Sequence, residues 1–149
     1  MSEFSDDNSA LSTPTVTSGE ARIALSIKQP WATLVVHGLK SIELRRWRPK
    51  RLGVLYIHTG AKPDESEAAW EKLPRHLTTF AELRRGVVGR VRLVGTKRYD
   101  SLDSFREDCG RHLAPEEWFA STGLFGWLFE NAETLPFEPR PGNQRLFRL

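Results

Sequence analysis

The residues best suited to chemistry lie close together: Lys40, Glu43 and Arg45 occupy a segment enclosed by two tryptophans, Trp31 and Trp47. A lysine ammonium attracts a phosphate, and a lysine whose pKa is lowered can act as a general base. The arginine guanidinium can donate two parallel hydrogen bonds to a phosphate or a base edge. The glutamate can accept a hydrogen bond from an exocyclic amine such as that of cytosine. A tryptophan can stack on a base, which stabilises binding by about 1–3 kcal/mol. Together these residue types predict a site for a nucleotide.

Positive charge is concentrated in the first half of the chain, although the formal net charge is only +3. Between residues 22 and 62 the single acidic residue is Glu43, and the basic residues are Arg22, Lys28, Lys40, Arg45, Arg46, Arg48, Lys50, Arg51 and Lys62. A local excess of this kind creates a field that attracts polyanions. It favours RNA or another nucleic acid as the partner, and the alternative is a basic face that is only solvated.

Cysteine and histidine usage gives no sign of a metal site. Cys109 is the single cysteine, which excludes an internal disulfide and a cysteine-rich zinc site. The 4 histidines, His37, His58, His76 and His112, show no metal-ligand spacing. We therefore expect no metal and no cofactor, and a reducing, cytoplasmic compartment.

Two further expectations concern membranes and domain organisation. No apolar run approaches the roughly 20 residues that cross a bilayer, and no secretory signal is visible, so we expect no membrane association. Residues 1–20 are rich in Ser, Thr, Asp and Glu and cannot bury enough surface to offset the entropy of ordering. The sequence predicts a flexible tail over 1–20 and a single folded domain over 21–149. It does not predict the oligomeric state.

Strands and helices of the domain follow from the apolar patterning. Alternation predicts strands over 23–28, 41–47, 54–59, 86–94, 124–129 and 144–149. Helices are predicted from Pro30 to Gly38, over 64–73 with Asp64 as its cap, over 101–109, and beginning within 115–119. Within the strand over 41–47, Glu43, Arg45 and Trp47 share one face. The fold class is α/β (α+β), with a mixed sheet that curls into a small barrel flanked by short helices.

Two consecutive motifs carry a family resemblance. The first is Gln29-Pro30-Trp31-Ala32, and the second is the segment 38–47, GLKSIELRRW, which fits the pattern G-x-K-x-x-E-x-R-x-W. In these motifs the chain closely resembles the ASCH domain family. The likeness continues through the segments 53–58, 86–89 and 125–127, so it extends over nearly everything from Leu25 to Leu149.

The resemblance implies a PUA-like fold, which is a small mixed β-barrel with flanking short helices and a cleft beside the opening motif. It implies RNA binding, and for some members hydrolysis: N4-acetylcytidine amidohydrolase activity in small bacterial members, and ribonuclease activity in others. Lys40 matches the lysine of the amidohydrolases, but Glu43 stands where they carry threonine. For their glutamate only Glu107 and Asp108 are loose candidates by chain order. Fold alone does not choose between binding and catalysis.

The function favoured by these observations is binding of single-stranded or modified RNA in a basic cleft. The expected contacts are Lys28, Gln29, Trp31, Lys40, Glu43, Arg45, Trp47, Lys50, His58 and Lys62. The second possibility is an enzyme, either a ribonuclease or an amidohydrolase, with Lys40 and Glu43 as the catalytic candidates. The third possibility is a protein-interaction adaptor. Structural alternatives stay open, with Trp31 as a cleft wall, Glu43 pairing with Arg45 or Lys40, and His58 held by structural hydrogen bonds. If Lys40 and Glu43 meet in a partly dry cleft, each favours the charged form of the other.

Overall fold

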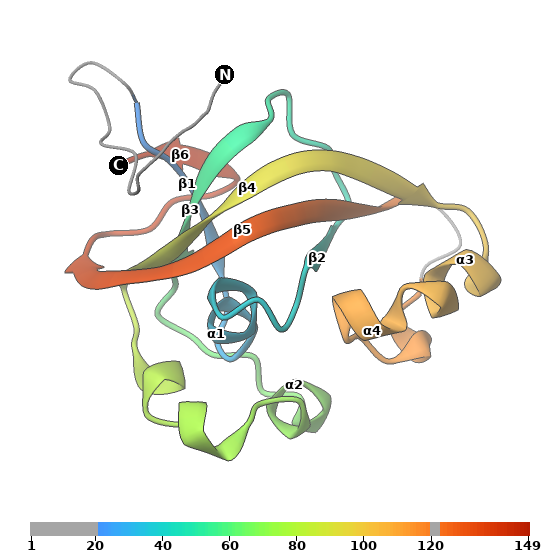
Figure 1. Ribbon diagram of the computed structural model, residues 1–149, viewed down its shortest axis with the longest axis horizontal. Coiled ribbons are helices and arrows are strands. Elements are labelled where there is room, and N and C mark those ends of the chain that lie inside the picture. Colours follow the sequence, from blue (N-terminus) through green and yellow to red (C-terminus); the bar gives the residue numbers. More distant parts are fainter. Residues whose placement is uncertain (1–20, 120–122) are drawn as a thin grey trace.

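The computed structural model describes residues 21–119 and 123–149, so the tail predicted over 1–20 lies outside the described residues. A single mixed sheet forms its centre, and short helices lie on one side of it (Figure 1). The strands are β1 (Ile23–Ile27), β2 (Ile42–Arg45), β3 (Gly53–Thr59), β4 (Gly86–Tyr99), β5 (Leu124–Pro139) and β6 (Leu146–Arg148). The helices are α1 (Trp31–Val36), α2 (Glu67–Glu71), α3 (Leu102–Glu107) and α4 (Cys109–His112), with 3-10 turns at Arg75–Leu77, Phe80–Glu82 and Glu116–Trp118.

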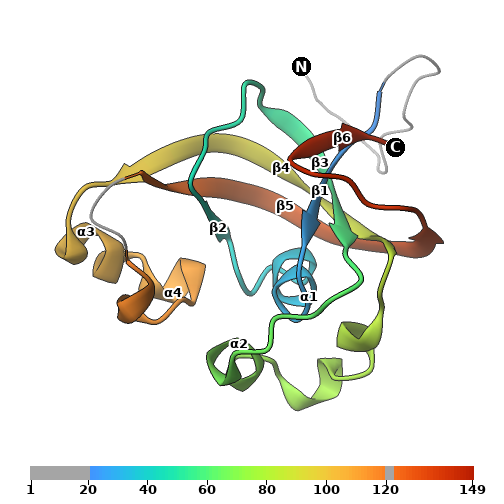
Figure 2. The same cartoon turned by 180° about the vertical axis from the view of Figure 1, so that it is seen from behind.

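The sheet has 6 strands in the order β2-β5-β4-β3-β1-β6. β1 and β3 run parallel, whereas the other neighbouring pairs are antiparallel. β4 and β5 are the longest strands and pair over most of their length, with three interruptions in register. Both bend strongly, so the sheet curves around α1 (Figures 1 and 2).

The barrel expected from the sequence is not closed. Within the described residues, the end strands β2 and β6 do not pair with each other. β6 pairs with β1 only from Ile23 to Leu25. Beyond Leu25, β1 therefore has no strand partner on that side in the described part of the chain. The fold class itself, a mixed α/β domain with short flanking helices, is confirmed.

α1 fills the concave side of the sheet, and all of its residues are buried. The alternation predicted for β1 and β3 is present: Leu25 and Ile57 pack in the main core with α1, whereas Ala24 and Tyr56 pack in a separate cluster on the opposite face. α1 approaches β4 so closely that a Cβ at Gly89 would lie 2.6 Å from Cγ1 of Val36. Only glycine leaves room for this contact, because neither the helix nor the strand can move away from a buried interface.

The largest differences from the sequence-based expectation are in three elements. β4 and β5 extend beyond the predicted 86–94 and 124–129, because each supplies the other with a hydrogen-bonding partner in segments that carry many polar residues. α2 is shorter than 64–73 and has Ser66 at its N-cap position. Asp64 does not cap the helix: its Oδ1 accepts a hydrogen bond from the Ser66 amide, and its Oδ2 accepts one from the indole of Trp31.

Candidate nucleic-acid interface

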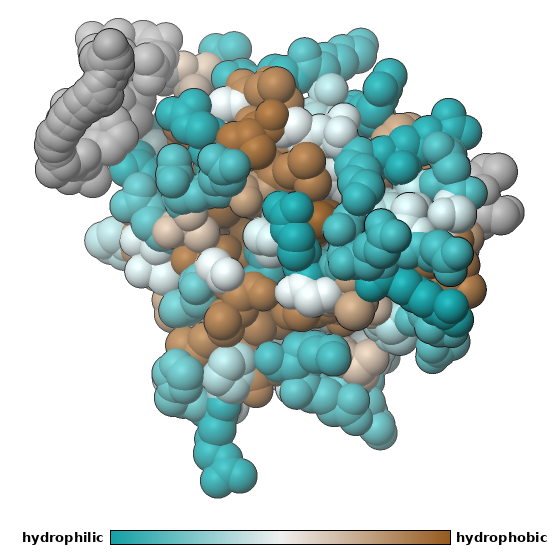
Figure 3. Space-filling view, turned by 45° about the vertical axis from the view of Figure 1, so that its right-hand side comes forward, coloured by the Kyte–Doolittle hydropathy of each residue, from teal (hydrophilic) through white to brown (hydrophobic). Residues whose placement is uncertain are grey.

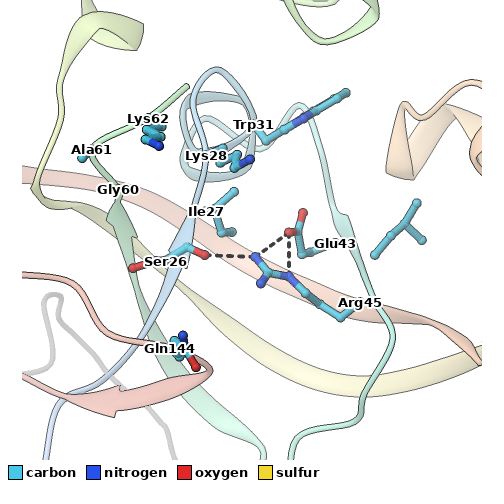
Figure 4. A pocket seen from close by; sticks show the side chains of 11 residues that line it. Ser26, Ile27, Lys28, Trp31, Glu43, Arg45, Gly60, Ala61, Lys62 and Gln144 are labelled. Carbon is cyan, nitrogen blue, oxygen red and sulfur yellow. Dashed lines mark hydrogen bonds and ion pairs between the residues drawn. The ribbon is translucent and has the colours of Figure 1, made fainter. Parts of the chain in front are cut away.

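A cleft of about 900 Å³ opens where the end of β1 faces β2 (Figure 4). This is the gap that strand pairing would have to fill if the barrel were closed. Its lining comes from the end of β1 and the residue after it, the first residue of α1, β2, the segment after β3 and one residue before β6: Ser26, Ile27, Lys28, Trp31, Glu43, Leu44, Arg45, Gly60, Ala61, Lys62 and Gln144. Lys28 and Lys62 are exposed, so their ammonium groups are accessible to a ligand at its rim.

Arg45 spans the cleft from β2 to β1. Its Nη2 donates to the backbone oxygen of Ser26 at 3.0 Å, at the point where β1 has left its pairing with β6 (Figure 4). Its Nε and Nη2 also donate to Oε2 of Glu43, at 3.0 and 2.9 Å. The pairing of Glu43 with Arg45, which the sequence left open as an alternative, is therefore present. It holds the guanidinium rigidly at the edge of the cleft, because both ends of the interaction are fixed to strands.

Lys40 lies behind Glu43 rather than in the cleft, with only 4% of its surface exposed. Its Nζ donates to the carbonyl oxygen of His112 at 2.6 Å and lies 3.7 Å from Oε1 of Glu43. Lys40 and Glu43 do meet, as expected. Burial is nevertheless the largest influence and lowers the pKa of Lys40, while Glu43 opposes that shift. Glu43 thus favours the charged form of Lys40, as expected, but burial opposes it and the net shift of the Lys40 pKa is downward.

Trp31 forms a wall between the cleft and a smaller hollow of about 120 Å³, which Lys40 and Trp118 also line. Its Nε1 donates to Asp64 at 2.7 Å. The Lys40 ammonium sits 4.8 Å from its ring centroid, in the range of a cation–π contact. With 7% of its surface exposed, Trp31 offers a ligand part of a fixed apolar wall and not a free stacking face.

Two of the predicted contacts, Gln29 and His58, are buried outside the cleft. Oε1 of Gln29 accepts hydrogen bonds from the amide and hydroxyl of Thr33, which satisfies a free N–H in the first turn of α1. His58 is 1% exposed. Its Nδ1 lies 2.7 Å from Oγ of Ser26, and its Nε2 lies 2.8 Å from the carbonyl oxygen of Arg140. Both side chains position backbone that borders the cleft.

Trp47 and Lys50 also lie apart from the cleft lining. The Trp47 ring packs edge-on against Trp127, with ring centroids 4.7 Å apart, and the guanidinium of Arg145 lies 4.2 Å from its centroid. Lys50 is an exposed residue of the turn after β2. Of the expected contacts, the cleft thus brings together Lys28, Trp31, Glu43, Arg45 and Lys62.

Sequence reasoning missed several residues that build the site. Gln144 reaches the cleft from the segment between β5 and β6, and Ser26 supplies the oxygen that holds Arg45. No motif marks either position, because both depend on contacts between distant segments. Glu107 and Asp108 are the loose candidates for the glutamate of the amidohydrolases. Glu107 is exposed at the end of α3, and Asp108 accepts hydrogen bonds from Lys97 and Tyr99.

His112 is a buried histidine whose hydrogen bonds define its protonation state. The Ala114 amide donates to Nδ1 at 3.0 Å, so this nitrogen carries no proton, and Nε2 lies 2.8 Å from the Phe105 carbonyl oxygen, to which it donates. Burial is the largest influence and lowers the pKa of His112 below its ordinary 6.5. Its carbonyl oxygen holds Lys40, so the neutral ring supports the backbone behind Glu43.

We expect the free energy of unfolding to decrease as the pH falls below 6.5, the ordinary pKa of the histidine. The unfolded chain then binds a proton that the folded chain resists, so the stability present above that pH is progressively lost. Urea denaturation between about pH 7 and about pH 5 measures this dependence. The pH dependence of the free energy of unfolding should become flatter in His112→Asn. It should persist in His76→Asn, because His76 is exposed. An unchanged dependence in His112→Asn would contradict this assignment.

The described part of the chain contains no candidate metal site. Residues 21–119 and 123–149 contain no group of three or more His, Cys, Asp or Glu side chains arranged to hold an ion. In the same ranges, no helix is both long and apolar enough to traverse a bilayer. The face shown in Figure 3 is mostly hydrophilic, with a strip of apolar side chains running between the polar ones.

Comparison with known proteins agrees with the motifs and with the fold. The family model described as ASCH domain matches residues 25–140. The crystal structure of ASCH from Zymomonas mobilis is similar with a TM-score of 0.57 at 16% identity, covering 86% of this chain and 87% of that one. A tyrosine-to-phenylalanine mutant of that protein gives a TM-score of 0.58 at 16% identity, covering 86% and 89% of the two chains. A comparison with curated protein sequences found no match. The family model spans most of the chain, and the chain belongs to the ASCH domain family.

Proposed function

We propose that the chain binds single-stranded RNA in the cleft between β1 and β2. One observation carries the proposal: three cationic side chains, Lys28, Arg45 and Lys62, converge on a cleft that also has an apolar wall. Lysine and arginine are the side chains that contact phosphates. A single strand can splay its bases toward a wall such as Trp31, whereas the bases of a duplex are stacked inside it.

The carboxylate of Glu43 gives the cleft an acceptor that can hydrogen-bond with a base. Its Oε2 is engaged by Arg45, and its Oε1 lies 3.7 Å from the Lys40 ammonium. Oε1 keeps acceptor capacity, because a carboxylate oxygen has two lone pairs. A cytosine or adenine amine could donate to it. Arg45 and Glu43 would then recognise a phosphate and a base from the same strand edge.

We expect the affinity for a short single-stranded RNA to fall linearly with salt on a log–log plot, by about 0.7 per phosphate contact. Fluorescence anisotropy with a labelled RNA measures it. Arg45→Ala should reduce the slope by about one contact, whereas Arg46→Ala, which removes an exposed arginine outside the cleft lining, should leave it unchanged. No binding even at low salt would contradict the proposal.

A second candidate function, hydrolysis of RNA or of a modified nucleoside, is favoured by one observation. Burial lowers the pKa of Lys40, and this is the direction that turns a lysine into a base. However, Nζ donates to the His112 carbonyl oxygen and faces Glu43, which suits a positioning role. Chromatography of the same RNA samples, and of samples with N4-acetylcytidine, distinguishes the two. Turnover that disappears in Lys40→Ala would establish hydrolysis.

A further inference from the structure

Another hollow, here called the distal pocket, lies beside the cleft. It has a volume of about 490 Å³ and is lined by His58, Gly60, Ala61, Arg85 and the segment 139–142. Gly60 and Ala61 line the cleft as well, so the two hollows share a border. The end of β5 and the segment that follows it form a wall of both, because they contribute 139–142 to the distal pocket and Gln144 to the cleft.

The wall of the distal pocket is held by contacts with the body of the domain. The carbonyl oxygen of Arg140 accepts from Nε2 of the buried His58 at 2.8 Å, and the Arg140 amide donates to the Arg85 carbonyl oxygen at 3.0 Å. Gly142 packs so tightly that a Cβ there would lie 2.7 Å from Cε1 of His58. A wall fixed in this way is preorganised for a ligand.

The charges of the distal pocket are positive. Nε of Arg140 donates to Glu138 at 2.8 Å, which orients the guanidinium and leaves its terminal nitrogens without a hydrogen-bond partner in residues 21–119 and 123–149. Arg85 is exposed. It adopts a left-handed conformation with φ of 61°, which non-glycine residues occupy at a cost. Two guanidinium groups at one pocket favour a phosphate.

The border between the two hollows is open. Gly60 has no side chain, and no heavy atom lies within 4 Å of the position that its Cβ would occupy. A polymer could therefore cross from the cleft to the distal pocket over Gly60 and Ala61. A free nucleoside placed in the cleft would leave the distal pocket and its arginines unused.

We propose that the distal pocket binds the phosphate and nucleotide adjacent to the one in the cleft, so that the ligand is a strand of at least two nucleotides. This rests on the proposed function, because it assigns a second subsite to the same strand. Arg85 and Arg140 contact the linking phosphate, and the cleft residues Lys28, Arg45 and Lys62 hold the first nucleotide. The neighbouring base lies against the wall formed by 139–142.

The test compares cytidine 5′-monophosphate with tetracytidylate by isothermal titration calorimetry on the full chain. We expect Arg85→Gly to weaken tetracytidylate binding by about tenfold and to leave the monophosphate unaffected. Glycine adopts the left-handed conformation without strain, so folding is not compromised. Arg75→Ala, which removes an exposed arginine that lines neither the cleft nor the distal pocket, serves as the matched control.

A second variant tests whether the strand crosses the border between the two hollows, by adding a bulky side chain there instead of removing a charge. Gly60→Leu should weaken tetracytidylate binding by about tenfold, whereas Gly110→Leu, also in open space, should not. If tetracytidylate binds but neither Arg85→Gly nor Gly60→Leu changes its affinity, the second subsite is wrong and the proposed function stands. If neither ligand binds the unaltered protein, the proposed function itself fails.

Discussion

Replacing Glu43 with alanine is expected to lower the free energy of unfolding by about 3 kcal/mol, the typical cost of leaving a buried charge without its partner. Lys40 is 4% exposed, and Glu43 is the carboxylate that faces it, at 3.7 Å. The same substitution removes both hydrogen bonds that hold Arg45 on β2. Urea denaturation at neutral pH measures the loss.

A double variant separates the charge effect from the loss of packing. Lys40→Met with Glu43→Leu replaces the ion pair by apolar side chains of similar volume, an exchange that is often neutral. We expect it to recover most of the stability lost in Glu43→Ala. If Glu43→Ala changes the free energy of unfolding by less than about 0.5 kcal/mol, as for an ordinary surface residue, then Lys40 does not depend on Glu43.

The largest functional effect is expected from reversing the two lysines at the rim of the cleft. Lys28→Glu with Lys62→Glu should weaken single-stranded RNA binding by roughly 100-fold, because each lost charge-assisted contact contributes about 1.5 kcal/mol. Both lysines are exposed, so the fold should tolerate the change. Fluorescence anisotropy at one fixed salt concentration measures the affinity.

The matched control carries the same change of net charge at positions away from the cleft. Lys50→Glu with Lys72→Glu reverses two exposed lysines that do not line it. Long-range attraction weakens equally in both double variants, so only contacts made within the cleft can distinguish them. Equal losses in the two would show that RNA binds through net charge and not in this cleft.

The family, the fold class and much of the core could be predicted from the sequence. Motifs and alternation are local signals: the pattern of residues 38–47 placed Glu43 and Arg45 on one strand face, and the structure pairs them. Pro30 and Gly38 likewise predicted the bounds within which the short helix α1 forms.

The remaining features depend on contacts between segments that are distant in sequence. Lys40 lies among the cleft-forming residues in the motif, yet a carbonyl oxygen 72 positions away at His112 holds it behind them. His58 is separated by 82 positions from Arg140, which it fixes, and a lone histidine on a strand gives no sign of such a partner. The open barrel likewise follows from the short pairing of β6 with β1, which alternation cannot predict.

The location of RNA on the protein is tested most directly by an NMR titration of the ¹⁵N-labelled chain with a short single-stranded RNA. Amide signals of Lys28, Gly60, Ala61 and Lys62, and the indole signal of Trp31, should shift in proportion to the bound fraction. The amide signal of Lys72, which lies outside the cleft lining, should stay in place. Shifts confined to other surfaces, or no shift at RNA concentrations well above that of the protein, would contradict binding in the cleft between β1 and β2.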